Sequence, residues 1–137
     1  MKMKINNISR LVVTRDGFIA AWVQILLPFH RLRPMETKLG VELIKLREDL
    51  GKSGMTQDAI KSALLSRHAR ETICNTLNVS LFSFKTMLSA LRKVGFIKDD
   101  DVNPRFMPRL APGEKQFRLL YHFDIKDNGE ADEHDEG

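Results

Sequence analysis

The chain has 137 residues, enough for one domain that buries its own core. Its 42% apolar and 29% charged residues are ordinary for a globular protein. The single cysteine, Cys74, excludes an internal disulfide and suits a reducing compartment, so we expect a cytoplasmic protein. The most apolar stretch, 18–29, is shorter than the ~20 residues that span a bilayer. We expect no secretory signal, because no apolar run follows the basic residues at the start.

The net charge of +4 conceals an uneven distribution. Residues 127–137 hold six Asp or Glu and no Lys or Arg, whereas residues 1–126 hold 22 Lys or Arg and 12 Asp or Glu, a net charge of +10 with histidine neutral. A basic body favours a polyanionic partner such as nucleic acid. We expect residues 1–126 to form the domain and residues 127–137 to be a disordered acidic tail. The tail could remain solvated, fold over the basic surface in competition with DNA, or bind another protein.

Apolar residues recur at helical spacing over most of the chain. Pro28 bends or ends the first predicted helix, on which Trp22, Ile25 and Leu26 are the expected core residues. The predicted helices lie near residues 18–30, 34–50, 56–65, 67–77 and 80–94.

A β-hairpin wing is predicted after these helices, on residues 96–125. Its clearest strand is 116–125, where aromatic and polar side chains alternate in part. Residues 103–113 contain the prolines and glycine of a loop. The acidic run 99–101 lacks the spacing of a calcium loop and indicates a solvated turn.

A tight turn stands between the last two predicted helices. Asn78 tolerates the left-handed conformation of such a turn, Val79 fills the angle between the helices, and Ser80 can cap the second helix. Later apolar residues pin that helix to the core, and a glycine releases the chain into an extended segment. The positions of this motif are Leu77, Asn78, Val79, Ser80, Phe84, Leu88, Leu91, Gly95, Phe96 and Ile97.

The motif resembles the winged helix-turn-helix superfamily, including MarR-type regulators and replication initiators of plasmids and phages, over about residues 34–125. The resemblance implies a mainly α fold with a small β-hairpin wing. It also implies that the second helix enters the major groove of double-stranded DNA. Residues 1–33 match no part of the pattern and would form an N-terminal helical extension. Members of the superfamily often dimerise, and residues 1–50 could supply a homodimer interface.

The same resemblance implies candidate DNA contacts on the second helix, on the preceding helix and in the wing. Cations there would meet phosphates, and hydroxyl groups would meet bases or phosphates. The candidates are Ser80, Ser83, Lys85, Thr86, Ser89, Arg92 and Lys93 on the second helix, Arg67, His68 and Arg70 before it, and Arg105, Arg109, Lys115 and Arg118 in the wing.

Leu81 and Phe82 depart from the family pattern, which usually has small or polar residues at these positions. Phe82 could contact a thymine methyl group, or the pair could be covered by residues 1–33 or by a protein partner. Burial of the pair within one chain would keep DNA binding as the leading interpretation. An exposed apolar patch would strengthen the alternative, a protein contact.

The expected function is DNA binding in transcription or replication control, with no enzymatic activity, cofactor or metal. The alternative is a non-enzymatic protein-interaction module on the same fold, such as a phage assembly or virion component. No phosphate-binding loop or nucleophile motif is present. The four histidines lack ligand spacing, and one cysteine cannot complete a zinc site.

Overall fold

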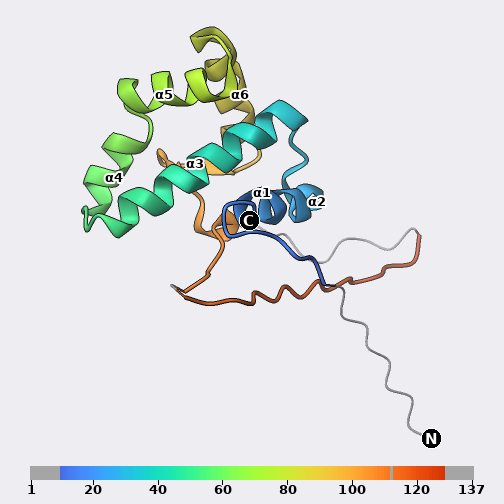
Figure 1. The fold of residues 1–137 in the computed structure, drawn as a ribbon. Helices are drawn as coiled ribbons and strands as arrows, with labels where there is room; N and C mark the ends of the chain where they lie inside the picture. Colours follow the sequence, from blue (N-terminus) through green and yellow to red (C-terminus); the bar gives the residue numbers. More distant parts are fainter. Residues whose placement is uncertain (1–9, 112, 129–137) are drawn as a thin grey trace, which may run out of the picture.

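A computed structural model of the chain describes residues 10–111 and 113–128 (Figure 1). Over these ranges the fold is mainly α-helical, with a small antiparallel β-hairpin after the last helix, which confirms the predicted fold class. None of the described helices is both long and apolar enough to cross a membrane. Residues 1–9 of the predicted dimer segment and residues 129–137 of the predicted acidic tail lie outside the described part.

The predicted helix over 18–30 is instead two helices, α1 (Phe18–Ile25) and α2 (Leu27–His30). The break follows from Pro28, which has no amide hydrogen and is tolerated only in the first turn of a helix. Trp22 is buried as expected, but Ile25 is exposed, which corrects its assignment to the core. The indole Nε1 of Trp22 donates a 2.8 Å hydrogen bond to the Phe106 carbonyl, which ties α1 to the end of the hairpin region.

α3 (Pro34–Lys52) is the longest helix and crosses the middle of the molecule (Figure 1). It contacts α1, α4, α5 and α6, so helices from both halves of the chain pack against it. Gly40 lets the Phe96 ring, which follows α6, lie directly against α3, because a Cβ atom at residue 40 would lie 2.9 Å from Cζ of that buried ring.

Three further helices follow: α4 (Gln57–Leu64), α5 (Arg67–Leu77) and α6 (Leu81–Lys93). Their bounds agree with the predicted helices to within a residue or two at each end. The hydroxyl oxygens of Thr56, Ser66 and Ser80 each accept a hydrogen bond from a backbone amide three residues later. These caps satisfy amides that have no partner within the helix.

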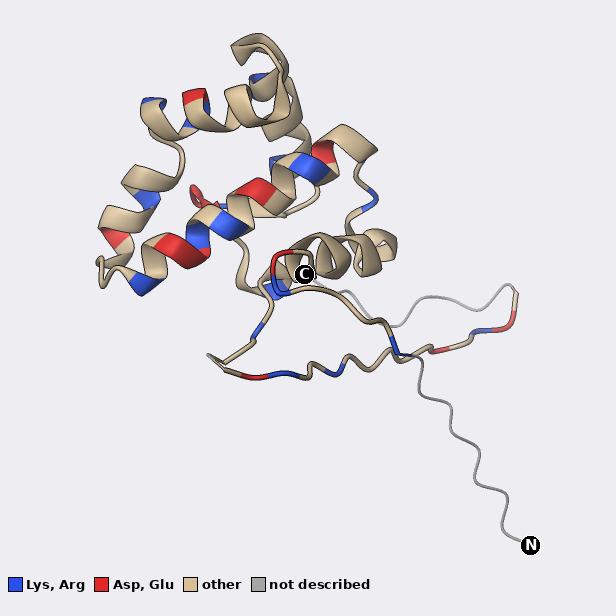
Figure 2. Cartoon of the chain, in the orientation of Figure 1, with Lys and Arg blue, Asp and Glu red and all other residues tan. Residues whose placement is uncertain are grey.

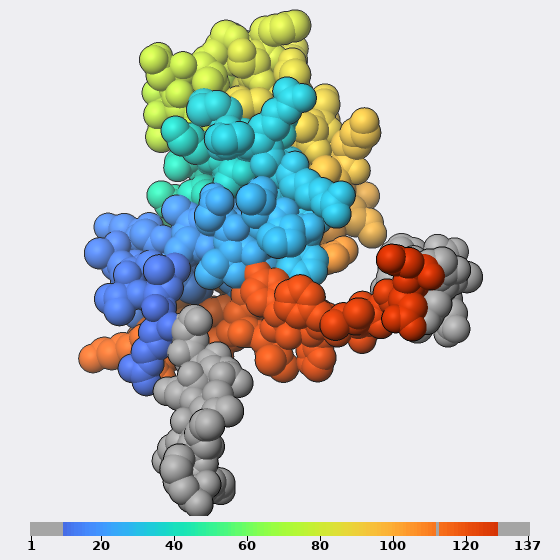
Figure 3. All heavy atoms as spheres, turned by 90° about the vertical axis from the view of Figure 1, so that its right-hand side faces the viewer, coloured from blue at the N-terminus to red at the C-terminus, as the bar shows by residue number. Residues whose placement is uncertain are grey.

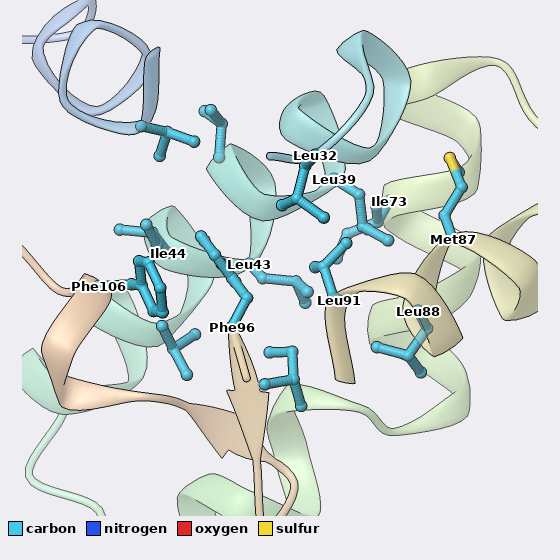
Figure 4. Packing of buried hydrophobic residues seen from close by; sticks show 14 of the residues in the cluster. Leu32, Leu39, Leu43, Ile44, Ile73, Met87, Leu88, Leu91, Phe96 and Phe106 are labelled. Carbon is cyan, nitrogen blue, oxygen red and sulfur yellow. The ribbon is translucent and has the colours of Figure 1, made fainter. Parts of the chain in front are cut away.

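The core lies between α3, α6 and the aromatic side chains that follow α6 (Figure 4). The predicted burial of Phe84, Leu88 and Leu91 is confirmed, since none of them is more than 2% exposed. Phe96 and Phe106 stack with their ring centroids 5.0 Å apart, which closes the core beneath the hairpin.

The hairpin is much shorter than the predicted wing. It consists of β1 (Ile97–Lys98) and β2 (Asp101–Val102), followed by the 3₁₀ helix η1 (Pro104–Phe106). Asp99 and Asp100 form the turn with φ values of 54° and 59°, the left-handed pair that a two-residue type I′ turn requires.

The predicted strand over 116–125 is wrong, because this segment has no strand partner among the described residues. Two of its aromatic side chains, Phe117 and Tyr121, pack on α1 and α2 instead of entering a sheet. The centroid of Phe117 lies 5.4 Å from that of Phe18, and Tyr121 stacks on Phe29 at 5.7 Å. In addition, prolines between η1 and this segment cannot donate the hydrogen bonds of a sheet.

Candidate nucleic-acid interface

The candidate interface is built on α5, α6 and the turn between them. Asn78 adopts φ 56° and ψ 50°, and the Val79 amide donates to the Cys74 carbonyl at 3.0 Å. This is the hydrogen bond of a Schellman motif, which lets the chain leave α5 sharply. Ser80 Oγ then accepts from the Ser83 amide at 3.1 Å and starts α6. The predicted turn and cap roles of Asn78 and Ser80 are confirmed.

The outward face of α6 carries most of the predicted contacts, and α6 contains no acidic residue. Ser83 is only partly exposed and its hydroxyl oxygen accepts from that of Ser80 at 3.1 Å, so part of its bonding capacity is used within the helix end. The Thr86 hydroxyl donates to the Phe82 carbonyl at 3.2 Å but remains an acceptor. The exposed residues of this face are Leu81, Phe82, Lys85, Thr86, Ser89, Arg92 and Lys93.

Leu81 and Phe82 are exposed at the beginning of α6, by 48% and 79% respectively. Figure 1 places α1 and α2 on the far side of α3 from α5, so residues 10–33 do not cover this pair. Of the three possibilities for Phe82, a thymine methyl group and a protein partner therefore remain for the described part of the chain. An exposed pair is the outcome that favours a protein contact.

A hollow of about 260 Å³ lies beside Leu81, between the starts of α5 and α6. Two of the predicted cations that line it are already engaged. Arg67 Nε lies 2.9 Å from Glu71 Oε1, and Arg70 Nε donates to the Leu65 carbonyl at 2.9 Å while its guanidinium covers the Phe84 ring. Lys85 also lines this hollow and is exposed, and within the described residues its ammonium group makes no ion pair or hydrogen bond.

The hairpin beside α6 is acidic rather than basic. Asp99 and Asp100 are its exposed tip, and Arg92 Nη2 lies 3.2 Å from Asp100 Oδ1. Arg47 Nε lies 2.7 Å from Asp101 Oδ1 in a pair that is largely buried. The predicted solvated turn over 99–101 is thus a turn, but it presents carboxylates where the expected wing would present cations to phosphate. The run of three aspartates in the sequence was the available signal for this.

The cations assigned to the wing lie elsewhere. Residues 109–111 and 113–118 follow η1 and run along the α1–α2 end of the molecule, away from α5 and α6 (Figures 1 and 2). The predicted site therefore divides into groups. Lys85, Arg92 and Lys93 lie together on α6, Arg105 lies on η1 with its guanidinium over the Phe106 ring, and Arg109, Lys115 and Arg118 belong to the segment that runs away from α6.

Comparisons of the chain with protein-family models, with curated proteins and with solved structures give no match. In the described ranges, no three His, Cys, Asp or Glu side chains are grouped so that they could hold a metal ion. The geometry of the α6 face and the charges around it are therefore the basis for a functional proposal.

Proposed function

We propose that the chain is a winged helix-turn-helix protein that binds double-stranded DNA through α6, in transcription or replication control. The capped turn between α5 and α6 and the hairpin after α6 support this class of fold. The observation that carries the proposal is the outward face of α6, which combines cations and hydroxyl groups, holds no carboxylate and is left uncovered by the rest of the described chain.

In this proposal, Lys85 and Lys93 contact phosphates, and Thr86 and Ser89 reach base edges. Phe82 would lie against a thymine methyl group. Arg92 contributes less than the two lysines, because DNA would have to compete with its ion pair to Asp100. The acidic hairpin tip supplies no phosphate contact, so α6 is the main binding element.

Fluorescence anisotropy with a random-sequence duplex at several salt concentrations tests this function. Each lost phosphate contact should flatten the log–log salt slope by ~0.9. Lys85→Ala and Lys93→Ala should therefore weaken binding to every sequence, while Thr86→Ala should change sequence preference. Lys38→Ala, which removes the same charge from an exposed site on α3, is the matched control. Absence of binding at ~50 mM salt would rule the proposal out.

A second candidate is a non-enzymatic protein-interaction module on the same fold, such as a phage assembly or virion component. The exposure of Leu81 and Phe82 favours it, because adjacent exposed apolar side chains more often meet protein than DNA. The acidic hairpin tip and the separate position of the wing cations also weigh toward it.

A photoreactive phenylalanine analogue at position 82 separates the two candidates. Irradiation in cells that produce the protein should give a nucleic-acid adduct if α6 binds DNA, and a protein adduct if the pair is a protein contact. The same analogue at position 38, exposed on α3, controls for adducts formed by chance.

A further inference from the structure

Residues 115–127 run in extended form along the α1–α2 end of the molecule (Figure 1). The sequence of residues 115–125 alternates in part like a strand, yet their backbone amides and carbonyls make no backbone hydrogen bond to another described residue. An extended segment with an unpaired edge is a ready template for pairing with another chain.

One end of the segment is anchored to its own domain and the other is not. Phe117 packs edge-on against Trp22 with centroids 5.2 Å apart, and the Tyr121 hydroxyl donates to the Ile25 carbonyl. Beyond Tyr121 the chain projects away from the helices (Figure 3). Phe123 and Ile125 on this projecting half are 81% and 90% exposed.

Exposed apolar side chains are concentrated at this end of the molecule. Ten of the 14 large apolar residues that are exposed in the described structure lie on α1, on α2 or on the two terminal segments beside them. Exposed apolar patches of this kind mark interaction surfaces. The ten are Leu11, Val12, Val13, Ile25, Leu27, Phe29, Leu119, Leu120, Phe123 and Ile125.

The charges of the segment are complementary to those of a second copy of itself. In an antiparallel pair centred on Tyr121, residue 118 of one copy lies opposite residue 124 of the other, which sets Arg118 against Asp124 twice. The same register sets Lys115 against Asp127. Opposite charges directly across an antiparallel pair stabilise it, and like charges destabilise it.

The apolar residues and the position of the domain fit this register too. It sets Phe117 opposite Ile125 and Leu119 opposite Phe123, so the exposed residues of the projecting half meet the anchored half of the other copy. Each domain covers one half of its own segment, and the twofold axis places the two domains over opposite halves of the pair.

We propose that two copies of this chain form a dimer by antiparallel pairing of residues 117–125 about a twofold axis at Tyr121. The interface is isologous, with the same residues contributed by both copies. It differs from the dimer segment expected from sequence, residues 1–50, because the pairing edge comes from the end of the domain and α1 and α2 only support it. It does not depend on DNA binding.

Sedimentation velocity of the full chain from about 1 to 100 µM tests the dimer. Arg118→Glu and Asp124→Arg should each weaken dimerisation on the order of tenfold, because each places like charges opposite one another twice. The double variant R118E/D124R should restore the dimer, because it recreates both pairs with reversed sign. Lys38→Glu, an equal charge reversal on exposed α3, should leave the dimer unchanged.

Cross-linking tests the register directly. In a Cys74→Ser background, Arg118→Cys mixed with Asp124→Cys should form an intermolecular disulfide, and neither variant should do so alone, because like positions lie about 20 Å apart in this pairing. A monomer at 100 µM, a double variant as weak as the single ones, or cross-links that form equally without mixing would overturn the proposal. No DNA enters these measurements, so their outcome is separate from that of the anisotropy experiment.

Discussion

Leu88→Ala should destabilise the domain by about 2–5 kcal/mol. Leu88 is 2% exposed and lies on the face of α6 that meets the core (Figure 4). The substitution removes three buried carbon atoms, and at about 0.8 kcal/mol for each the transfer term alone is roughly 2 kcal/mol. The cavity left behind adds the rest, because the buried residues around Leu88 cannot collapse fully around a smaller side chain.

Urea unfolding followed by tryptophan fluorescence measures this loss, since Trp22 is the one tryptophan of the chain and is buried in the same core. The midpoint should fall while the dependence on urea stays constant. Phe82→Ala, a larger truncation at a 79% exposed position of the same helix, should change stability by less than about 0.5 kcal/mol. An equally small loss for Leu88→Ala would mean that α6 packs through another face.

Three further outcomes are expected. His30→Leu should cost about 2–4 kcal/mol in urea unfolding, because it leaves the Val23 carbonyl and the Leu32 amide, now bonded to the buried ring at 2.8 and 2.9 Å, without partners; a neutral effect would mean that water replaces the ring. Burial raises the pKa of Glu48, so ionisation of this carboxyl disfavours the folded state and the free energy of unfolding falls as pH rises through that pKa. Glu48→Gln should therefore stabilise the folded domain slightly at pH 7. That gain should vanish below about pH 4, where Glu48 is protonated in both states, and a gain that persists there would have another cause. If α6 binds DNA, deleting the acidic residues 127–137 should tighten DNA binding, most of all at low salt. Equal DNA affinities of the full and the shortened chain would mean that the tail does not compete with DNA.

The elements that the sequence predicts well are those with local causes. Helices α4, α5 and α6 are capped by Thr56, Ser66 and Ser80, whose hydroxyl oxygens accept hydrogen bonds from amides only three residues away. Helical spacing likewise assigns each residue of α6 to its buried or exposed face. The exposure of Lys85 and the burial of Phe84 follow from that spacing alone.

The site was predictable only as far as it lies on one helix. The outward face of α6 was expected, but the engagement of Arg92 by Asp100 across the hairpin was not, because it depends on where a neighbouring element turns. The position of segments 109–111 and 113–118 at the α1–α2 end of the molecule depends in the same way on the path of the chain after η1.

The helices and the α5–α6 turn could be predicted from the sequence, because they depend on a 3.6-residue apolar period and on hydrogen bonds between residues only a few positions apart. Tertiary structure alone decided whether the alternating segment 116–125 is a strand. A strand needs a partner from elsewhere in the chain, and here Phe117 and Tyr121 pack on α1 and α2 instead, while Phe123 and Ile125 of the same alternating set stay exposed. Alternation is a local pattern, and only the fold specifies whether a neighbouring strand pairs with the segment.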